Sequence, residues 1–287
     1  MPQLDTLIAD VEKLFEGGHE CDPALVEALG HAIAQTVARR LAEKDEDRKF
    51  TLRLSAIGRP DRQLWYDAHH KGVPEPLPPS AKVKFLFGDI LEHMLLFLAK
   101  EAGHEVTDEQ KELVIDGVKG HMDCKIDGIP VDAKSCSTFA FDKFKDGTLR
   151  HDDSFGYMWQ ISAYSHAENA KEAAFFAIDK QLGHMCLLRI PGAELDLYDV
   201  HERIAEQKAV VALDAPPERC DDDVADGKSG NRKLATICGY CKHKQECWPE
   251  LRTFLYANGP RFLTKVERLP DVPEKGVNKD QKEDVSQ

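Results

Sequence analysis

The chain has 287 residues, of which 42% are hydrophobic and 31% are charged, and its net charge is −13. This length allows one large domain with or without an appendage. The negative charge argues against a general nucleic-acid binder, although residues 228–252 hold six Lys or Arg against two Glu. The first residues lack the features of a signal peptide, and no apolar run has the length of a membrane span, so we expect a soluble, cytoplasmic protein.

The first third of the chain predicts helices around a loop-rich stretch. Apolar residues recur at helical spacing over residues 4–17, and a second helix starts at Pro23 with Asp22 as its N-cap. We expect residues 1–48 to form a helical appendage. Residues 47–80 are rich in loops and contain a proline cluster. The following helix, over residues 81–101, is apolar almost all round and is therefore expected to be buried. The clustered prolines are Pro74, Pro76, Pro78 and Pro79.

The next part of the chain alternates strands and helices. A strand over 113–118, a hairpin, a loop over 139–153 and a helix over 154–170 precede two strands, at 173–179 and 185–190, and a helix over 193–212. This order predicts an α/β core with a mixed central β-sheet flanked by helices. The expected core covers residues 49–215. A cysteine-containing segment covers 216–262, and the polar tail, 263–287, is expected to be disordered.

The expected hairpin brings charged side chains together. Asp127-Gly128, flanked by isoleucines, predicts a two-residue turn, and the resulting register places Asp123 opposite Asp132 and His121 opposite Lys134 on one face. Two facing carboxylates repel each other, and a hard divalent cation between them removes that cost. The Lys134 ammonium suits stabilisation of a nucleophilic hydroxide or of negative charge on a phosphate. The alternative is a salt bridge on an exposed strand.

Glu92 is a further acidic candidate. It lies within the apolar helix, where an ionised carboxylate is costly without a partner. A partner cation would explain it. The alternative is that Glu92 lies on a narrow solvent-facing stripe of the helix.

These residues resemble the PD-(D/E)XK nuclease superfamily. Val131-Asp132-Ala133-Lys134 is similar to its catalytic motif, with Val131 in place of the usual proline, and Gly120-His-Met-Asp123 is similar to its second motif. Gly88-Asp-Ile-Leu-Glu92 resembles its first motif. Gln160-Ile-Ser-Ala-Tyr164 resembles the Q-x-x-x-Y motif of the RecB-like branch, which includes phage-type recombination exonucleases and Cas4. The resemblance covers about residues 50–250.

The resemblance implies a restriction-endonuclease-like core and a role for each motif residue. Asp123 and Asp132 would bind Mg²⁺ or Mn²⁺, and Glu92 would bind it directly or through water. Lys134 would orient the attacking water, while Gln160 and Tyr164 would position DNA or the active site. His121 would be a metal neighbour or would contact phosphate.

Four cysteines near the C-terminus suggest a metal centre. Cys238-Gly-Tyr-Cys241-Lys-His-Lys-Gln-Glu-Cys247 has the spacing C-x2-C-x5-C, and Cys220 lies upstream. Four thiolates can hold Zn²⁺ or an iron–sulfur cluster. The spacing resembles the iron–sulfur domain of Cas4 and AddB-type nucleases, whose first ligand precedes the nuclease core. The matching region of this chain, residues 58–66, has no cysteine, so Cys220 is the expected substitute and Cys21 a second choice. A [4Fe–4S] cluster is favoured over zinc, and His243 is an alternative ligand.

Two further segments are candidates for DNA contact. The first segment combines guanidinium groups with aromatic rings, from Arg59, Arg62, Trp65 and Tyr66. This combination suits binding of a nucleic-acid strand. Alternatively, Trp65 and Tyr66 anchor a helix in the core. The basic loop over residues 228–233 is a phosphate contact or a solvated loop.

The leading hypothesis is a metal-dependent DNA exonuclease of phage or prophage recombination, with DNA and a single-strand annealing or other recombination protein as partners and no membrane contact. The alternatives are a Cas4-like or structure-specific endonuclease and a catalytically idle DNA-binding protein.

Overall fold

The computed structural model describes residues 3–43, 50–69 and 79–276, which divide into two compact units. Unit 1 consists of Met1–Arg59 and Glu75–Ala209, and unit 2 of Pro60–Pro74 and Val210–Gln287. The described residues 60–69 group with the C-terminal part of the chain. Most of the proline cluster lies outside the described residues, and its last member, Pro79, begins helix α4.

Unit 1 contains the mixed central sheet that the sequence predicts. Its strand order is β1-β4-β5-β6-β7. Strands β5 and β6 are parallel, and the other neighbours are antiparallel. Strand β6 is apolar along most of its length because helices cover both faces of the sheet. The strands are β1 (Val106–Thr107), β4 (Cys124–Ile126), β5 (Ile129–Cys136), β6 (Glu172–Asp179) and β7 (Met185–Pro191).

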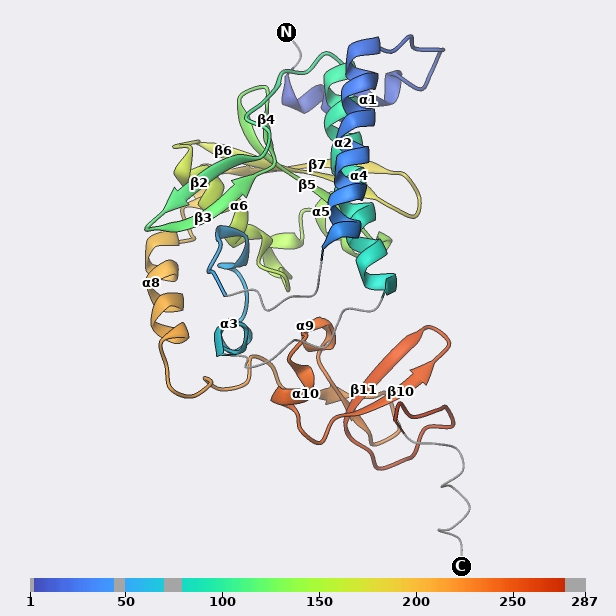
Figure 1. Ribbon diagram of the computed structural model, residues 1–287, viewed down its shortest axis with the longest axis vertical. Coiled ribbons are helices and arrows are strands. Elements are labelled where there is room, and N and C mark those ends of the chain that lie inside the picture. Colours follow the sequence, from blue (N-terminus) through green and yellow to red (C-terminus); the bar gives the residue numbers. More distant parts are fainter. Residues whose placement is uncertain (1–2, 44–49, 70–78, 277–287) are drawn as a thin grey trace, which may run out of the picture. The chain divides into compact units, whose positions relative to one another are not determined.

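The two faces of the sheet carry different helices (Figure 1). Helices α1 (Leu7–Lys13) and α4 (Pro79–Glu101) pack against the face that presents Phe176 of β6. Helices α5 (Thr138–Lys145) and α6 (Tyr157–Ala167) pack against the opposite face, which presents Phe175. Alternate residues of one strand therefore enter two separate hydrophobic clusters.

The N-terminal helices differ from the expected appendage. Leu7 and Val11 of α1 are fully buried in the cluster beneath α4, and the short 3-10 helix η1 (Leu4–Thr6) precedes them. Helix α2 (Pro23–Ala42) lies along α4 (Figure 1). Its predicted N-cap is confirmed, since the Asp22 side chain accepts a hydrogen bond from the Ala24 amide at 2.8 Å.

Helix α4 is buried in its second half only. Leu95, Leu96, Leu98 and Ala99 are buried, whereas Val83, Phe85 and Phe87 expose 46%, 51% and 54% of their surface. The expectation of a helix buried throughout is therefore wrong. Apolar composition does not reveal that only the second half of the helix packs against the sheet and α1.

A second hairpin precedes the predicted one. Strands β2 (Lys111–Ile115) and β3 (Val118–Met122) form a separate two-stranded sheet, joined by the turn Asp116-Gly117. The φ angles are +48° and +76° at this turn and +50° and +81° at the predicted Asp127-Gly128 turn. Two consecutive positive φ angles are typical of the tight turns that match the twist of paired strands. The chain therefore leaves one sheet after Met122 and enters the other at Cys124.

The β2–β3 hairpin packs on helix α6 and on residues further along the chain. Met122 and Leu113 share a cluster with Tyr164 of α6, with Leu54 of the 3-10 helix η2 (Leu54–Ala56), and with Ile204 of α8 (Val200–Val211). The helix expected over 193–212 is instead two helices, α7 (Gly192–Leu195) and α8. A further 3-10 helix, η3 (Leu149–His151), precedes α6.

Unit 2 combines helix α3 (Asp61–His69) with a four-stranded antiparallel sheet in the order β10-β11-β9-β8. The expected disorder from residue 263 is wrong for residues 263–276, because β11 continues to Lys265 and Glu274 pairs with Arg252 at 2.6 Å. Residues 277–287 lie outside the described part. The remaining elements are β8 (Val224–Ala225), β9 (Arg232–Lys233), α9 (Thr236–Tyr240), α10 (Lys244–Cys247), β10 (Arg252–Tyr256) and β11 (Gly259–Lys265).

Within the described residues, the helices are too short or too polar to span a bilayer.

Candidate active site

Asp132 lies at the centre of the candidate site, on the inner strand β5. Its side chain is fully buried, and its Oδ1 accepts a hydrogen bond from Nε2 of Gln160 at 3.0 Å. Its Oδ2 forms an ion pair with the ammonium of Lys134. Asp132 and Lys134 share a face of β5, as predicted, because they are two residues apart on one strand.

Asp123 lies where the chain passes from one sheet to the other. Its Oδ2 accepts a hydrogen bond from the Ala133 amide of β5 at 2.8 Å, and its carbonyl accepts one from the Gln110 amide at 2.9 Å. The predicted hairpin register is confirmed from Ile126↔Ile129 to Cys124↔Val131, where the ladder ends. The Asp123 carboxylate is therefore fixed to strand β5, which also carries Asp132. Its contact on that strand is the backbone amide of Ala133, between Asp132 and Lys134.

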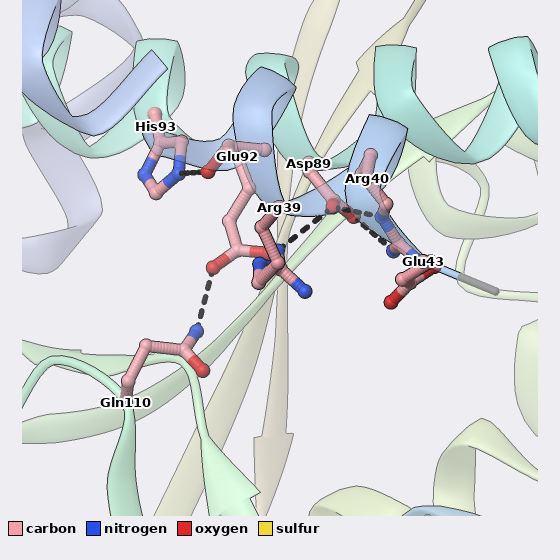
Figure 2. A network of polar contacts seen from close by, with 8 residues as sticks. Arg39, Arg40, Glu43, Asp89, Glu92, His93 and Gln110 are labelled. Carbon is pink, nitrogen blue, oxygen red and sulfur yellow. Dashed lines mark hydrogen bonds and ion pairs between the residues drawn. The ribbon is translucent and has the colours of Figure 1, made fainter. Parts of the chain in front are cut away.

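Glu92 reaches this region from helix α4. Its Oε1 accepts a hydrogen bond from Nε2 of Gln110 at 2.8 Å (Figure 2). One turn earlier on the same helix, Asp89 is held by Arg40 through two hydrogen bonds of 2.7 and 2.9 Å and by Arg39 at 3.2 Å. Figure 2 shows Asp89 directed at these guanidinium groups and Glu92 directed at the glutamine.

The three acidic side chains are costly to ionise together. Burial, and then the charges of Asp132 and Asp89, raise the pKa of Glu92 to about 7. Burial and the charges of Asp132 and Glu92 also raise the pKa of Asp123 well above its usual range. Burial raises the pKa of Asp132 although Lys134 opposes the shift. Buried carboxylates that repel one another are typical of sites that bind a cation or handle protons.

Lys134 is held in its charged form at the edge of this group. Burial would lower the pKa of its ammonium, but the carboxylates of Asp132 and Asp123 raise it. The ammonium also lies 4.7 Å from the centre of the Tyr157 ring, which is within range of a cation–π contact. The Tyr157 ring in turn stacks on Phe155 at 5.7 Å, and Phe155 is 46% exposed. Two stacked aromatic rings, Tyr157 and Phe155, therefore extend from the partly buried Lys134 to the surface.

Gln160 and Tyr164 occupy one face of helix α6, as their spacing predicts. Nε2 of Gln160 donates to the Tyr164 hydroxyl at 3.1 Å as well as to Asp132, and Tyr164 is almost fully buried. The helix start is fixed by Asp153, whose carboxylate accepts the amides of Tyr157 and Met158 at 2.9 and 2.8 Å.

His121 does not belong to this group, and the expectation that it faces Lys134 is wrong. It pairs across the β2–β3 sheet with Glu112, whose carboxylate lies 4.0 Å from its Nε2, and its side chain is 54% exposed. The overlooked signal is Asp116-Gly117 between Ile115 and Val118, which is the same kind of turn sequence that identifies the next hairpin. No sequence pattern indicated the contacts of Gln110 or Tyr157.

The donor set of the site suits a hard divalent cation, because it consists of carboxylate oxygens. The cation site is not preformed, however. In the described ranges 3–43, 50–69 and 79–276, the three candidate oxygens of Glu92, Asp123 and Asp132 do not all lie within 4.8 Å of one another. The Lys134 ammonium pairs with Asp132 instead. Inward movement of the carboxylates would be needed for all three to reach one ion.

The four predicted cysteine ligands of unit 2 line a single pocket. Burial and the charge of Asp221 raise the pKa of Cys238 to about 12, and burial also raises the pKa of Cys220 and of Cys241. No three of the four sulfur atoms lie within 4.8 Å of one another. A tetrahedral zinc site with Zn–S bonds of 2.3 Å requires sulfur atoms about 3.8 Å apart. A single zinc ion would therefore require the sulfur atoms to move closer together.

Helix α3 contributes polar groups to this pocket. Nε of Arg62 donates to Sγ of Cys247 at 3.2 Å, and Nη2 donates to the Tyr66 hydroxyl at 3.3 Å. His243 is buried, stacks on Tyr66 and pairs with Asp67 at 2.7 Å. These contacts favour the alternative in which the aromatic residues of this segment anchor a helix.

The other proposed DNA contacts of unit 2 are also engaged within the protein. Nε1 of Trp65 donates to the Leu213 carbonyl at 2.8 Å. In the basic loop, Nε of Arg232 donates to Asp223 at 2.7 Å, and Lys233 lies 3.7 Å from Asp226. Acidic neighbours therefore offset much of the positive charge there.

No family model matches the chain, and no curated protein sequence matches it. Several solved structures are weakly similar to it. The protein SSO0001 is 17% identical, with 78% of this chain and 96% of that one aligned at a TM-score of 0.40. A phage-related exonuclease from Haemophilus somnus 129PT is 14% identical over 57% of this chain and 94% of its own, with a TM-score of 0.41. An alkaline exonuclease from Laribacter hongkongensis is 19% identical over 62% and 94%, with a TM-score of 0.40. Similarities this weak establish no activity.

Proposed function

We propose that the protein is a divalent-metal-dependent deoxyribonuclease that hydrolyses phosphodiester bonds. One observation carries the proposal: a fully buried Asp132 is paired with Lys134, and burial together with the Asp132 charge raises the pKa of two nearby carboxylates, Asp123 and Glu92. Such a costly group of charges needs a compensating role. Its members are the residues of the acidic and lysine motifs that resemble those of PD-(D/E)XK nucleases.

Each residue has a role that follows from its position. Asp123, Asp132 and Glu92 would hold Mg²⁺ or Mn²⁺, which when bound supplies charge neutralisation and lowers the pKa of a coordinated water. Lys134 would lose its pairing with Asp132 when the cation arrives, and its ammonium would then face the attacking water or a phosphate oxygen. Gln160 would keep Asp132 in place through its 3.0 Å hydrogen bond. Tyr164 would in turn orient the Gln160 amide.

Among nucleases, an exonuclease is the leading proposal, with a Cas4-like or structure-specific endonuclease as the alternative. The choice rests on the likeness of the glutamine–tyrosine motif to that of recombination exonucleases, which also suggests a recombination protein as a partner. A catalytically idle DNA-binding protein is less favoured, because the acidic residues and the lysine are all present.

A cleavage assay on two DNA forms tests these proposals. Linear duplex with labelled ends should be shortened progressively when Mg²⁺ or Mn²⁺ is added, and covalently closed circles should survive. Asp132→Asn should abolish cleavage while leaving the circular dichroism spectrum unchanged. Rapid nicking of closed circles would favour the endonuclease. Metal-independent cleavage, or full activity of Asp132→Asn, would overturn the proposed site.

We also propose that Cys220, Cys238, Cys241 and Cys247 bind a [4Fe–4S] cluster, with a structural zinc ion as the alternative. The support is their common pocket and the N–H of Arg62 directed at the Cys247 sulfur. Protein purified without oxygen should be brown and should bleach on reduction. A colourless protein with one equivalent of zinc would favour the alternative, and a protein with neither metal would show that the four residues are ordinary thiols.

A matched pair of variants checks the assignment. Cys238→Ser should lose the metal and loosen unit 2, because the pocket joins residues that are distant in sequence. Cys186→Ser, which changes a partly buried cysteine of β7 in unit 1, should keep the full metal content.

A further inference from the structure

A second group of metal-binding side chains lies at the end of helix α4, in unit 1. His19 and Cys21 come from the loop between α1 and α2, and Glu101 is the last residue of α4. One ligand atom of each residue lies within 4.8 Å of the other two, the only such trio in the part of the chain that the structure describes. Nε2 of His19 and Oε2 of Glu101 are 2.8 Å apart.

Glu101 occupies a position that a nearby cation would suit. The C-terminal end of a helix carries partial negative charge, so a carboxylate there is disfavoured. The Glu101 side chain is nevertheless only 3% exposed. Its second oxygen, Oε1, accepts the Asp22 amide at 3.0 Å, which fixes the orientation of the carboxylate. Oε2 is thereby directed at His19, and the thiol of Cys21 lies beside both.

We infer that His19, Cys21 and Glu101 bind a zinc ion, with water in the fourth position. An imidazole nitrogen, a thiolate and a carboxylate oxygen are the donor types that zinc takes, and they suit Mg²⁺ poorly because of the sulfur. Bond lengths of 2.0–2.3 Å need ligand atoms about 3.3–3.8 Å apart, so a small separation of His19 from Glu101 admits the ion. Binding releases the proton of the Cys21 thiol.

The ion would join the α1–α2 loop to the end of α4, two segments separated by about eighty residues. The simpler alternative is an ion pair between His19 and Glu101 with an unconnected thiol nearby. The two differ in what happens to Cys21, because only a bound zinc ion withdraws its sulfur from reaction. The site does not depend on the proposed nuclease activity.

Site-resolved alkylation of the full chain separates these alternatives. Cys21 is exposed, so iodoacetamide should modify it readily, and peptide mass spectrometry distinguishes it from the seven other cysteines. Zinc should slow the modification of Cys21 by roughly tenfold or more, since a coordinated thiolate is shielded, and Mg²⁺ should not. Equal rates with and without zinc would overturn the inference, as would equal protection by Mg²⁺.

Three variants complete the experiment. His19→Gln and Glu101→Gln should abolish protection by zinc. His31→Gln should keep it, because His31 is an exposed histidine that faces Glu27 at 3.9 Å on helix α2 and belongs to no such trio. Persistent protection in His19→Gln and Glu101→Gln would contradict the proposed ligands. The fully buried Cys124 serves as an internal check on folding, since it should stay unmodified in each variant.

Discussion

Gln160 and Asp132 are joined by a 3.0 Å hydrogen bond between a helix and the strand beneath it. The same amide donates to the Tyr164 hydroxyl, so the glutamine uses both of its N–H groups inside the protein. The buried carboxylate is therefore positioned by α6 as well as by its own strand. Disturbing this helix should alter the site even where no charged residue changes.

The first prediction concerns this positioning. Gln160→Ala should lower kcat by about 10- to 100-fold, as loss of a residue that orients a metal ligand commonly does. It should also reduce the free energy of unfolding by about 1–3 kcal/mol, because a buried oxygen of Asp132 loses its partner. Cleavage kinetics and urea unfolding measure the two effects. Gln35→Ala, on an exposed position of α2, is the control, and an unaltered kcat in Gln160→Ala would contradict the assigned role.

The second prediction concerns the Asp132–Lys134 pair. Lys134→Met should abolish cleavage and cost about 3–5 kcal/mol of stability, because it leaves a buried charge without its partner. The double variant Asp132→Asn/Lys134→Met should regain much of the stability but none of the activity. Lys125→Met is the control, since Lys125 pairs with Asp108 and Glu168 near the same hairpin. If the double variant lost as much stability as the two single variants together, the two residues would not be a coupled pair.

The third prediction concerns pH. The folded protein raises the pKa of Glu92 from 4.5 to about 7, so between these values the folded chain holds a proton that the unfolded chain has released. Without metal, the stability of the wild type should therefore fall as pH rises through this window, by at most about 3 kcal/mol. Glu92→Gln removes this dependence, so it should match the wild type at pH 5 and exceed its stability at pH 8.

Thermal unfolding in a chelating buffer tests this dependence. Glu109→Gln is its control, since Glu109 pairs with Lys100 of α4 at 2.6 Å. Addition of Mg²⁺ should stabilise the wild type at pH 8 and affect Glu92→Gln much less. Parallel pH profiles for the wild type and Glu92→Gln would contradict the predicted shift.

The fourth prediction concerns the stacked rings of Phe155 and Tyr157. Phe155 is half exposed and stacks on Tyr157 beside Lys134, so a DNA base can stack on its outer face. Phe155→Ala should weaken binding of a short single strand by about 1–3 kcal/mol, measured by fluorescence anisotropy in the presence of Ca²⁺. Leu182→Ala changes another exposed apolar side chain and should leave affinity unchanged. Equal losses in the two variants would remove Phe155 from the binding surface.

Local signals in the sequence predicted several parts of this structure. Asp22 caps its helix, Asp127-Gly128 forms its turn, and Gln160 and Tyr164 share a helix face, because each depends on neighbours within a few residues. The mixed sheet followed from the order of strands and helices. The burial of α1 and the exposed first half of α4 could not be predicted in this way, since both depend on which distant segments pack together.

The misplacement of His121 had a different origin. The predicted register treated residues 121–126 as one continuous strand of the Asp127-Gly128 hairpin. The chain instead changes sheets at Asp123, and His121 pairs with Glu112. Glu92 and Asp132 were proposed from residue type. The effect of the Asp132 charge on the pKa of Glu92 arises from tertiary packing, which the sequence alone does not specify.

The change of sheet at Asp123 has a consequence for how this protein can vary. Two tight turns, Asp116-Gly117 before it and Asp127-Gly128 after it, set the registers of two hairpins independently. Asp123 is the single residue between their ladders. Substitutions along either hairpin would leave the location of Asp123 unchanged. Insertion or deletion of one residue between the two turns would instead rotate the acid away from β5, so length in this stretch should be constrained more tightly than identity.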